Sequence, residues 1–284
     1  MTQPQPHRAF AEINGAQLYY EVAGAGHPLV MLHGHLLDSG QWDDQVTAFA
    51  SAYQVIRYDA RGFGQSTLPP APYSHHEDLY ALLHHLGIDH ASLMGCSGGG
   101  ATIIDFALTY PTMVDALILV GTGMGGYQPA GPPPPQLLAM GEAMQSGDVA
   151  RTVELSLQVF TDGPRRTPAQ VNPQARERTR AMTEHLFTRP PVPEAVPRSV
   201  EPVALTRLSA ITAPTLVIVG GEDQAPLHDI ADLLMAQVAG AQKVIIPDAG
   251  HHPNLEQPEL FHQAVQTFLQ NITKANHGTD NLHP

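Results

Sequence analysis

Cysteine, basic residues and long apolar runs are all scarce in this sequence, and each scarcity excludes something. The 284 residues include one cysteine, Cys96, so no internal disulfide can form and the fold does not depend on an oxidising compartment. Lysine and arginine total 14 against 27 acidic residues, and the net charge of −13 argues against nucleic-acid and anionic-membrane partners.

The apolar runs are also short. ALILV at 116–120 has the length of a strand and cannot span a membrane. The N-terminal MTQPQPHRAF lacks the apolar stretch of a signal peptide. We therefore expect a cytoplasmic protein that acts on a small molecule and has no nucleic-acid or membrane partner. Nothing in the sequence indicates an oligomeric state.

What is present is an alternation of strand-like and helix-like segments. Short continuous apolar runs between helices are typical of a parallel sheet covered on both faces. A hairpin across Gly15 is expected at its start. The expected strands are 9–14, 17–22, 28–34, 53–62, 91–95, 115–121, 214–220 and 242–248, and the expected helices are 42–50, 77–88, 99–110, 227–238 and 256–271.

The alternation stops between residues 123 and 203. This segment opens on GTGMGGYQPAGPPPP, closes on RPPVPEAVP, and carries helical patterns at 136–146, 148–160 and 172–187. The proline clusters are either surface linkers or hinges of a lid over the carboxyl edge of the sheet. We expect a core of 1–122 and 204–284 that keeps its packing without this insertion.

The stretch SLMGCSGGGATIIDFALTYP at 92–111 places Ser97 between an apolar strand and an apolar helix. Gly95-Cys96-Ser97-Gly98-Gly99 fits G-x-S-x-G, the nucleophile elbow, in which flanking glycines allow a turn too tight for side chains. The first N–H groups of the helix point at the serine, and that of Gly98 is a candidate oxyanion donor.

A serine hydroxyl needs a general base, and the base needs an orienting acid. PTLVIVGGEDQAP supplies Asp223 just after a buried strand, with Glu222 as the rival. VIIPDAGHHPNLEQPELF supplies His251 on the loop before the last helix, with His252 as the rival. The chain order Ser, Asp, His is the one this architecture requires.

Other histidines have expected roles outside the triad. In LHGHLLDSGQW (32–42), the His35 N–H is the expected second oxyanion donor, with Leu36 as the alternative, and the His33 side chain is expected to tie loops together beneath the site. The pairs His75-His76 and His84-His85 are interpreted as solvated helix positions or helix ends.

Five motifs stand in this order along the chain: LHGHLLDSGQW, YDARGFGQS, MGCSGGG, PTLVIVGGED and DAGHHPNLEQPELF. Through these motifs the sequence resembles the α/β-hydrolase superfamily, in its capped esterase, lactonase and C–C hydrolase branch. The resemblance covers about 9–122 and 204–271. It implies a mostly parallel eight-stranded sheet flanked by helices, with a helical cap inserted after the sixth strand. Cys96 and Gly98 depart from the histidine and the large residue that relatives often carry around the serine. Ser97 stands where dehalogenases of this fold use Asp.

These features predict a serine hydrolase that cleaves a small or medium ester or lactone through an acyl-enzyme, without cofactor or metal. The alternatives are a C–C bond hydrolase, a cofactor-free perhydrolase, or a slow-turnover receptor. Cys96 is expected to be a buried small hydrophobe. Arg151, Arg165 and Arg166 are candidates for binding a substrate carboxylate. Candidate pocket residues are Leu36, Met124, Met140, Met144, Phe160 and His252.

Overall fold

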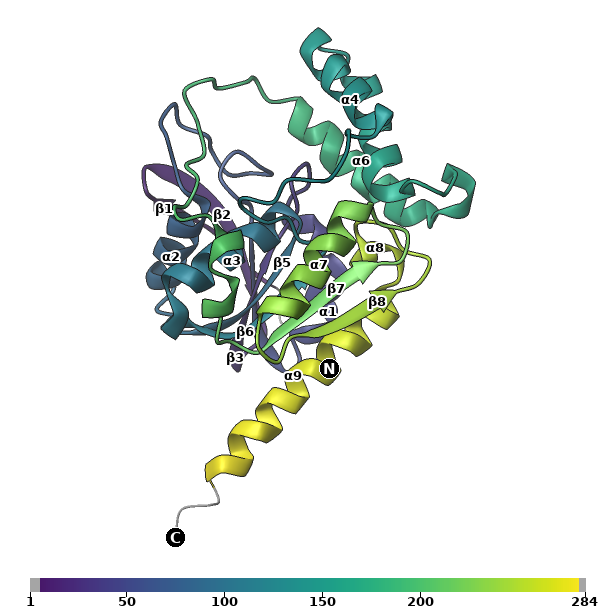
Figure 1. Ribbon diagram of the computed structural model, residues 1–284. Helices are drawn as coiled ribbons and strands as arrows, with labels where there is room; N and C mark the ends of the chain where they lie inside the picture. Colours follow the sequence, from purple (N-terminus) through teal and green to yellow (C-terminus); the bar gives the residue numbers. More distant parts are fainter. Residues whose placement is uncertain (1–5, 281–284) are drawn as a thin grey trace.

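The computed structural model describes residues 6–280, which form one eight-stranded sheet with helices on both faces (Figure 1). The strand order is β1-β2-β4-β3-β5-β6-β7-β8. β1 and β2 are antiparallel, as are β2 and β4, and every other pair is parallel, which confirms the predicted sheet. The strands are β1 (His7–Ile13), β2 (Ala16–Ala23), β3 (His27–Leu32), β4 (Tyr53–Tyr58), β5 (Ala91–Cys96), β6 (Val114–Val120), β7 (Thr215–Gly220) and β8 (Gln242–Ile246).

The first hairpin turns at Asn14 and Gly15. Both residues have positive φ, 47° and 78°, as a two-residue turn between twisted antiparallel strands requires. Ile13 pairs with Ala16 directly across the turn. The Asn-Gly pair therefore sets the register of β1 on β2.

Two apolar cores lie on opposite faces of the sheet. One contains the buried faces of α2 (His75–His85), α3 (Gly98–Thr109) and α7 (Ala225–Gln237). The other contains those of α1 (Asp43–Phe49) and α9 (Pro258–Asp280), with Trp42 and Phe261 among its largest members. Parallel strands buried on both faces are the reason that the central segments read as unbroken apolar runs.

Two predicted helices are interrupted. The one expected at 42–50 begins as a 3-10 turn, Ser39–Trp42, before α1. The one expected at 256–271 is divided into α8 (Pro253–Glu256) and α9, because Gln257 precedes a proline and takes a non-helical backbone conformation. The remaining 3-10 turns are Pro111–Met113, Pro168–Gln170, Ala204–Thr206 and Leu208–Ala210.

Between β6 and β7 the chain forms α4 (Pro135–Ser146), α5 (Val149–Ser156) and α6 (Pro173–Phe187), which stand above one corner of the sheet (Figure 1). The helix expected at 148–160 ends at Ser156 and continues as a π-helical segment, Leu157–Asp162. None of the described helices combines the length and apolar character required to cross a membrane.

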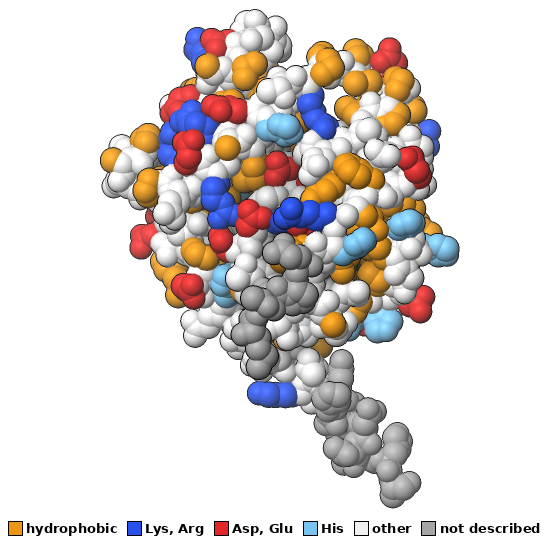
Figure 2. All heavy atoms as spheres, turned by 180° about the vertical axis from the view of Figure 1, so that it is seen from behind, with side chains coloured by type: hydrophobic (Ala, Val, Ile, Leu, Met, Phe, Trp, Pro, Cys, Tyr) orange, Lys and Arg blue, Asp and Glu red, His pale blue; other side chains and the backbone are white. Residues whose placement is uncertain are grey.

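Ion pairs hold this helical segment together and join it to the core. Arg176 binds Asp162 and Glu154, and Arg178 on α6 binds Asp44 of α1 at 2.6 Å. On the face seen in Figure 2, basic side chains lie beside acidic ones and form no patch of their own.

The arginine of YDARGFGQS has a structural role. Arg61 makes two 2.8 Å hydrogen bonds to the Asp78 carboxylate, and both side chains are at most 3% exposed. Arg61 also donates to the carbonyls of Ile13 and Asn14, so the pair fastens α2 to the first hairpin.

We expect Asp78→Ala to lower the free energy of unfolding by about 3–5 kcal/mol, because the buried Arg61 charge would lose its partner. Urea unfolding followed by circular dichroism measures this. Glu177→Ala, which removes a 74% exposed partner of Arg180, is the matched control and should change the value by less than about 0.5 kcal/mol. An Asp78→Ala loss below about 1 kcal/mol would contradict the role given to the pair.

Candidate active site

Ser97 lies at the turn from β5 into α3. Its backbone has φ 51° and ψ −115°, a conformation that is costly for a residue with a side chain. The turn is tight because a Cβ on Gly95 would stand 2.5 Å from the Gly99 carbonyl oxygen, and one on Gly99 would stand 2.5 Å from that of Leu32. Glycine is therefore required at both positions, and the serine is presented at the amino end of α3.

His251 and Asp223 form a buried pair at the carboxyl ends of the neighbouring strands. His251 Nδ1 lies 2.9 Å from Asp223 Oδ2 and 3.2 Å from Oδ1. The exposed fraction is 3% for His251 and 2% for Asp223. A buried carboxylate at this distance fixes the ring orientation and the tautomer with the proton on Nδ1, which leaves Nε2 to accept a proton.

The two rivals lack this arrangement. The Glu222 carboxylate binds Arg165 at 2.9 Å, away from the imidazoles. The His252 ring is buried, and its Nδ1 has no hydrogen-bond partner among residues 6–280. Burial, followed by the neighbouring His251, holds the pKa of His252 well below its usual range.

Shared contacts place the serine turn next to the histidine loop. Cys96 Sγ lies 3.9 Å from the His251 carbonyl oxygen. The segment after β6 touches both sides: the Gly123 N–H donates to the Ser97 carbonyl, and a Cβ on Gly121 would stand 3.1 Å from His251 Nδ1. Cys96 itself is buried, as expected, and burial raises the pKa of its thiol to about 12.

The predicted oxyanion donors have open N–H groups. The Leu37 N–H bonds to the Gly34 carbonyl and closes a turn around His35 and Leu36, with Leu36 at φ 70°. Within the part of the chain that the structure describes, the N–H groups of His35, Leu36 and Gly98 have no hydrogen-bond acceptor. The His35 ring fills the space beside Gly98, where a Cβ would meet it at 2.5 Å.

The imidazole rings of His33, His35 and His75 lie at this turn. His33 is buried, and its Nε2 accepts from the Ala60 N–H at 3.0 Å, which ties the loops after β3 and β4 together as expected. His35 stacks on Phe63 and lies near His75. Burial lowers the pKa of His35 and, with that ring beside it, lowers the pKa of His75 to about 4. His75 begins α2, which agrees with the interpretation of the pair as a helix end. The alternative that the pair is solvated is wrong, because His75 is packed against His35 and Tyr73 and His76 is buried.

Some of the predicted pocket residues lie near His251 and the turn at His35, and others lie away from them. The Phe160 ring lies 5.3 Å from that of His251, and His252 and Leu36 are also beside the triad or its oxyanion turn. Met124 is part of the main core instead, and Met140 is buried on α4. Met144 is 46% exposed on the outer side of α4.

Two of the three arginines expected to bind a substrate carboxylate bind groups of the protein instead, and the third is exposed. Arg166 donates to Glu256 and to the carbonyls of Thr161, Asp162 and Asp248. Arg165 binds Glu222, and Arg151 is exposed. Arg166 therefore fastens the π-helical segment to the loop that carries His251.

Two polar side chains that the sequence did not single out position the loops of the site. Gln41 accepts from the Gly34 N–H and contacts Asn254, whose amide in turn donates to the Gln41 carbonyl. Glu256 accepts from the Gly250 N–H at 2.6 Å, just before His251. Their only signal in the sequence is their place in the motifs SGQW and HHPNLE.

Comparison with known proteins identifies the family. The family model described as "Alpha/beta hydrolase family" matches residues 29–264, and the chain belongs to that family. A 2-hydroxy-6-oxononadienedioate/2-hydroxy-6-oxononatrienedioate hydrolase of Burkholderia vietnamiensis is 31% identical, over 89% of this chain and 91% of the relative. A 2-hydroxy-6-oxo-6-phenylhexa-2,4-dienoate hydrolase of Burkholderia cepacia is 28% identical, over 91% and 93%. The structure of Est816, an N-acyl homoserine lactone degrading enzyme, superposes with a TM-score of 0.72 at 28% identity, over 92% of this chain and 100% of that one.

The choice between Asp223 and Glu222 can be tested directly. We expect Asp223→Asn to lower kcat for a p-nitrophenyl ester by about 10³–10⁴-fold, because an amide can donate to the ring and favour the wrong tautomer. Glu222→Gln, which changes the adjacent side chain in the same way, should lose less than about 3-fold. Equal losses in the two variants, or the larger loss in Glu222→Gln, would overturn the assignment.

Proposed function

We propose that this member of the alpha/beta hydrolase family is a serine hydrolase that cleaves a small to medium, uncharged ester or lactone. The observation that carries the proposal is the buried His251–Asp223 pair next to a serine held at positive φ. A strained, glycine-flanked serine beside an oriented imidazole is the arrangement used for acyl transfer.

The reaction follows from this arrangement in two stages. His251 Nε2 removes the proton of the Ser97 hydroxyl as its oxygen attacks the carbonyl carbon. The tetrahedral oxyanion accepts hydrogen bonds from the Gly98 N–H and from His35 or Leu36. The protonated His251 then gives its proton to the leaving alcohol, and an acyl-enzyme remains. His251 then takes a proton from water as the water oxygen attacks the acyl carbon; the bond to Ser97 Oγ breaks, His251 returns the proton to that oxygen, and the acid is released.

The charges around the site favour a neutral substrate. Six arginines of the cap donate hydrogen bonds to carboxylates or carbonyls of the protein itself: Arg165, Arg166, Arg176, Arg178, Arg180 and Arg189. Arg151 and Arg198 are exposed. Burial lowers the pKa of both His35 and His252, so these rings add no positive charge at neutral pH. A dicarboxylate would lose its hydration here without gaining a paired cation.

C–C bond hydrolysis is the second candidate, and the names of the two relatives described above favour it. Those hydrolases are named for dienoate and dienedioate substrates, which carry one or two carboxylates. The same triad can serve that reaction. One observation argues against C–C bond hydrolysis. Among the described residues of the cap, 123–203, no buried arginine is left unpaired to bind a substrate carboxylate.

A comparison of substrates separates the two. A p-nitrophenyl ester series, a set of lactones and a vinylogous diketone acid would be assayed with the wild type and with Ser97→Ala. We expect ester or lactone kcat/KM to exceed that for the diketone acid, and Ser97→Ala to lose about 10³-fold or more, because covalent catalysis is removed. A fluorophosphonate should label the wild type at Ser97. A diketone preference would establish the second candidate, and labelling elsewhere would refute the nucleophile.

The helical segment 123–203 is proposed to set acyl selectivity, through Phe160 in particular. We expect Phe160→Ala to change relative kcat/KM along the ester series by about 10-fold or more, because the ring lies beside His251 and a removed aromatic side chain leaves a cavity. Met144→Ala, on the exposed side of α4, is the control and should leave the profile unchanged. A uniform loss for every ester in Phe160→Ala would assign the ring to positioning His251 rather than to selectivity.

A further inference from the structure

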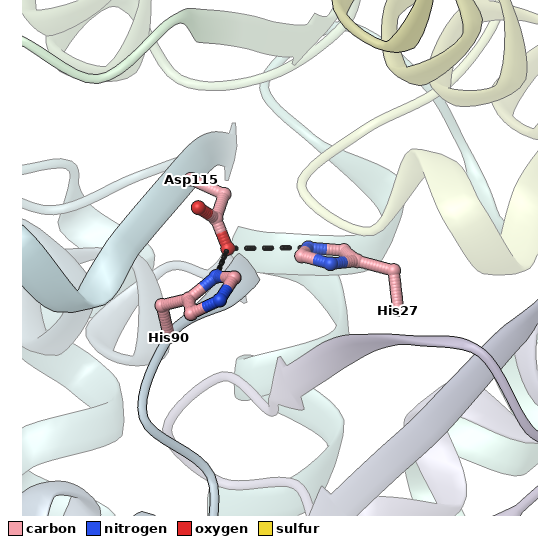
Figure 3. A group of neighbouring side chains, drawn as sticks. All are labelled: His27, His90 and Asp115. Carbon is pink, nitrogen blue, oxygen red and sulfur yellow. Dashed lines mark hydrogen bonds and ion pairs between the residues drawn. The ribbon is translucent and has the colours of Figure 1, made fainter. Parts of the chain in front are cut away.

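A second group of ionisable side chains lies at the opposite end of the sheet from the triad. Figure 3 shows the carboxylate of Asp115 between the rings of His27 and His90. Asp115 Oδ2 is 2.6 Å from His90 Nδ1 and 3.3 Å from His27 Nε2. One nitrogen from each ring and one carboxylate oxygen all lie within 4.8 Å of one another.

The register of three adjacent strands brings these residues together. Leu29 of β3 pairs with Ser92 of β5. Two positions earlier in each case stand His27, the first residue of β3, and His90, just before β5, whose ring centroids are 5.8 Å apart. The sequence separates the three residues by 63 and 25 positions, so no spacing pattern could reveal the group.

The position of Asp115 depends on an irregularity in the sheet. Ala91 pairs with Val114 and Ser92 pairs with Ala116, so Asp115 is an extra residue that faces no partner on β5. A bulge of this kind redirects a side chain that regular alternation would point to the other face. Here the neighbours Leu117 and Leu119 belong to one core and Ala116 and Ile118 to the other. The bulge lets Asp115 join the histidines on the face covered by α9.

We propose that His27, His90 and Asp115 bind a divalent transition-metal ion, with Zn²⁺ as the preferred occupant. Two imidazoles and one carboxylate are a donor set that suits Zn²⁺ better than Mg²⁺ or Ca²⁺, which prefer oxygen ligands. Zinc bonds of about 2.0–2.1 Å in a tetrahedron place ligand atoms about 3.3 Å apart. The His27–Asp115 separation already has that value. The His90–Asp115 contact is shorter and must lengthen by about 0.7 Å for the ion to enter between them.

The surroundings leave room for this adjustment and for a fourth ligand. The side chains of His27, Asp115 and His90 are 37%, 36% and 57% exposed. They line a hollow of about 280 Å³, together with Tyr53, Ser92, Leu269, Ile272 and Thr273. A water molecule can complete the coordination from this side, since the three protein ligands leave one tetrahedral position open.

The ion would act on the fold rather than on the reaction. His90 and Ser97 stand at opposite ends of β5, roughly 20 Å apart at about 3.3 Å per residue. At that distance the ion cannot touch the substrate of Ser97. It would instead link the starts of β3, β5 and β6, the three central strands.

Isothermal titration calorimetry tests the proposal. The full-length protein, without a tag and stripped of metal with EDTA, is titrated with ZnCl₂ at pH 7.5. We expect one equivalent to bind, a rise in Tm with added zinc, and a tetrahedral Co²⁺ absorption band on substitution. Asp115→Asn and His90→Gln should each weaken binding at least 10-fold and abolish the Co²⁺ band. His84→Gln, which removes an exposed imidazole on α2, should bind like the wild type.

The opposite results overturn the site. Absence of a stoichiometric event in the wild type, or the same affinity in Asp115→Asn and His90→Gln, would mean that zinc binds only adventitiously to surface histidines. Circular dichroism confirms that each variant is folded before titration. Hydrolysis by the stripped wild type should equal that of the zinc-loaded protein. A zinc-dependent rate that persists in Asp115→Asn would locate the functional ion elsewhere and refute the assignment, whatever the substrate of Ser97 proves to be.

Discussion

The parallel pairing of β3, β5 and β6 is the constraint on which the rest of the structure depends. Because these strands run in one direction, their carboxyl ends all open on the same edge, where the proposed oxyanion turn follows β3 and Ser97, the proposed nucleophile, follows β5. The continuation of the sheet through β7 and β8 adds Asp223 and His251 at that edge. The amino ends gather His27, His90 and Asp115 by the same geometry. One register therefore positions the residues of both proposed sites, at the two ends of the same strands.

The pairing of the strands does not fix the positions of the loops that carry the site residues. Hydrogen bonds between buried polar side chains fix these loops. Asn254 and Gln41, which are 213 residues apart, join the histidine loop to the oxyanion turn through hydrogen bonds inside the protein. Each of these amides is fully buried, so every unmade bond would cost free energy. The network thus fixes the relative position of the two loops more strictly than apolar packing would.

The features that were predictable from the sequence are those with local signals. Periodicity located the strands, and glycine spacing located the elbow, because a tight turn requires glycine where no Cβ fits. The break at Gln257 and the π-helical segment were missed, since the first depends on one pre-proline residue and the second on tertiary contacts. His75 lies at a helix start, as its sequence allows, but only the packing of α2 against the turn at His35 shows that its ring is covered.

Hydrogen bonds tie the helical insertion to the core domain. Its helices contribute no buried member to either main core, although Met124 at the start of the insertion belongs to one of them. The His251 N–H nevertheless donates to the Phe160 carbonyl, and Gln224, next to Asp223, donates to the Val159 carbonyl. Arg166 adds bonds from the same segment to Asp248 and Glu256. Val159 and Phe160 lie in the last turn of the segment Leu157–Asp162, where helical carbonyls lack partners within the helix and are available to these donors. We expect a chain without residues 126–200 to lose these bonds to the His251 loop, and we therefore propose that the insertion supports the candidate general base as well as covering the site.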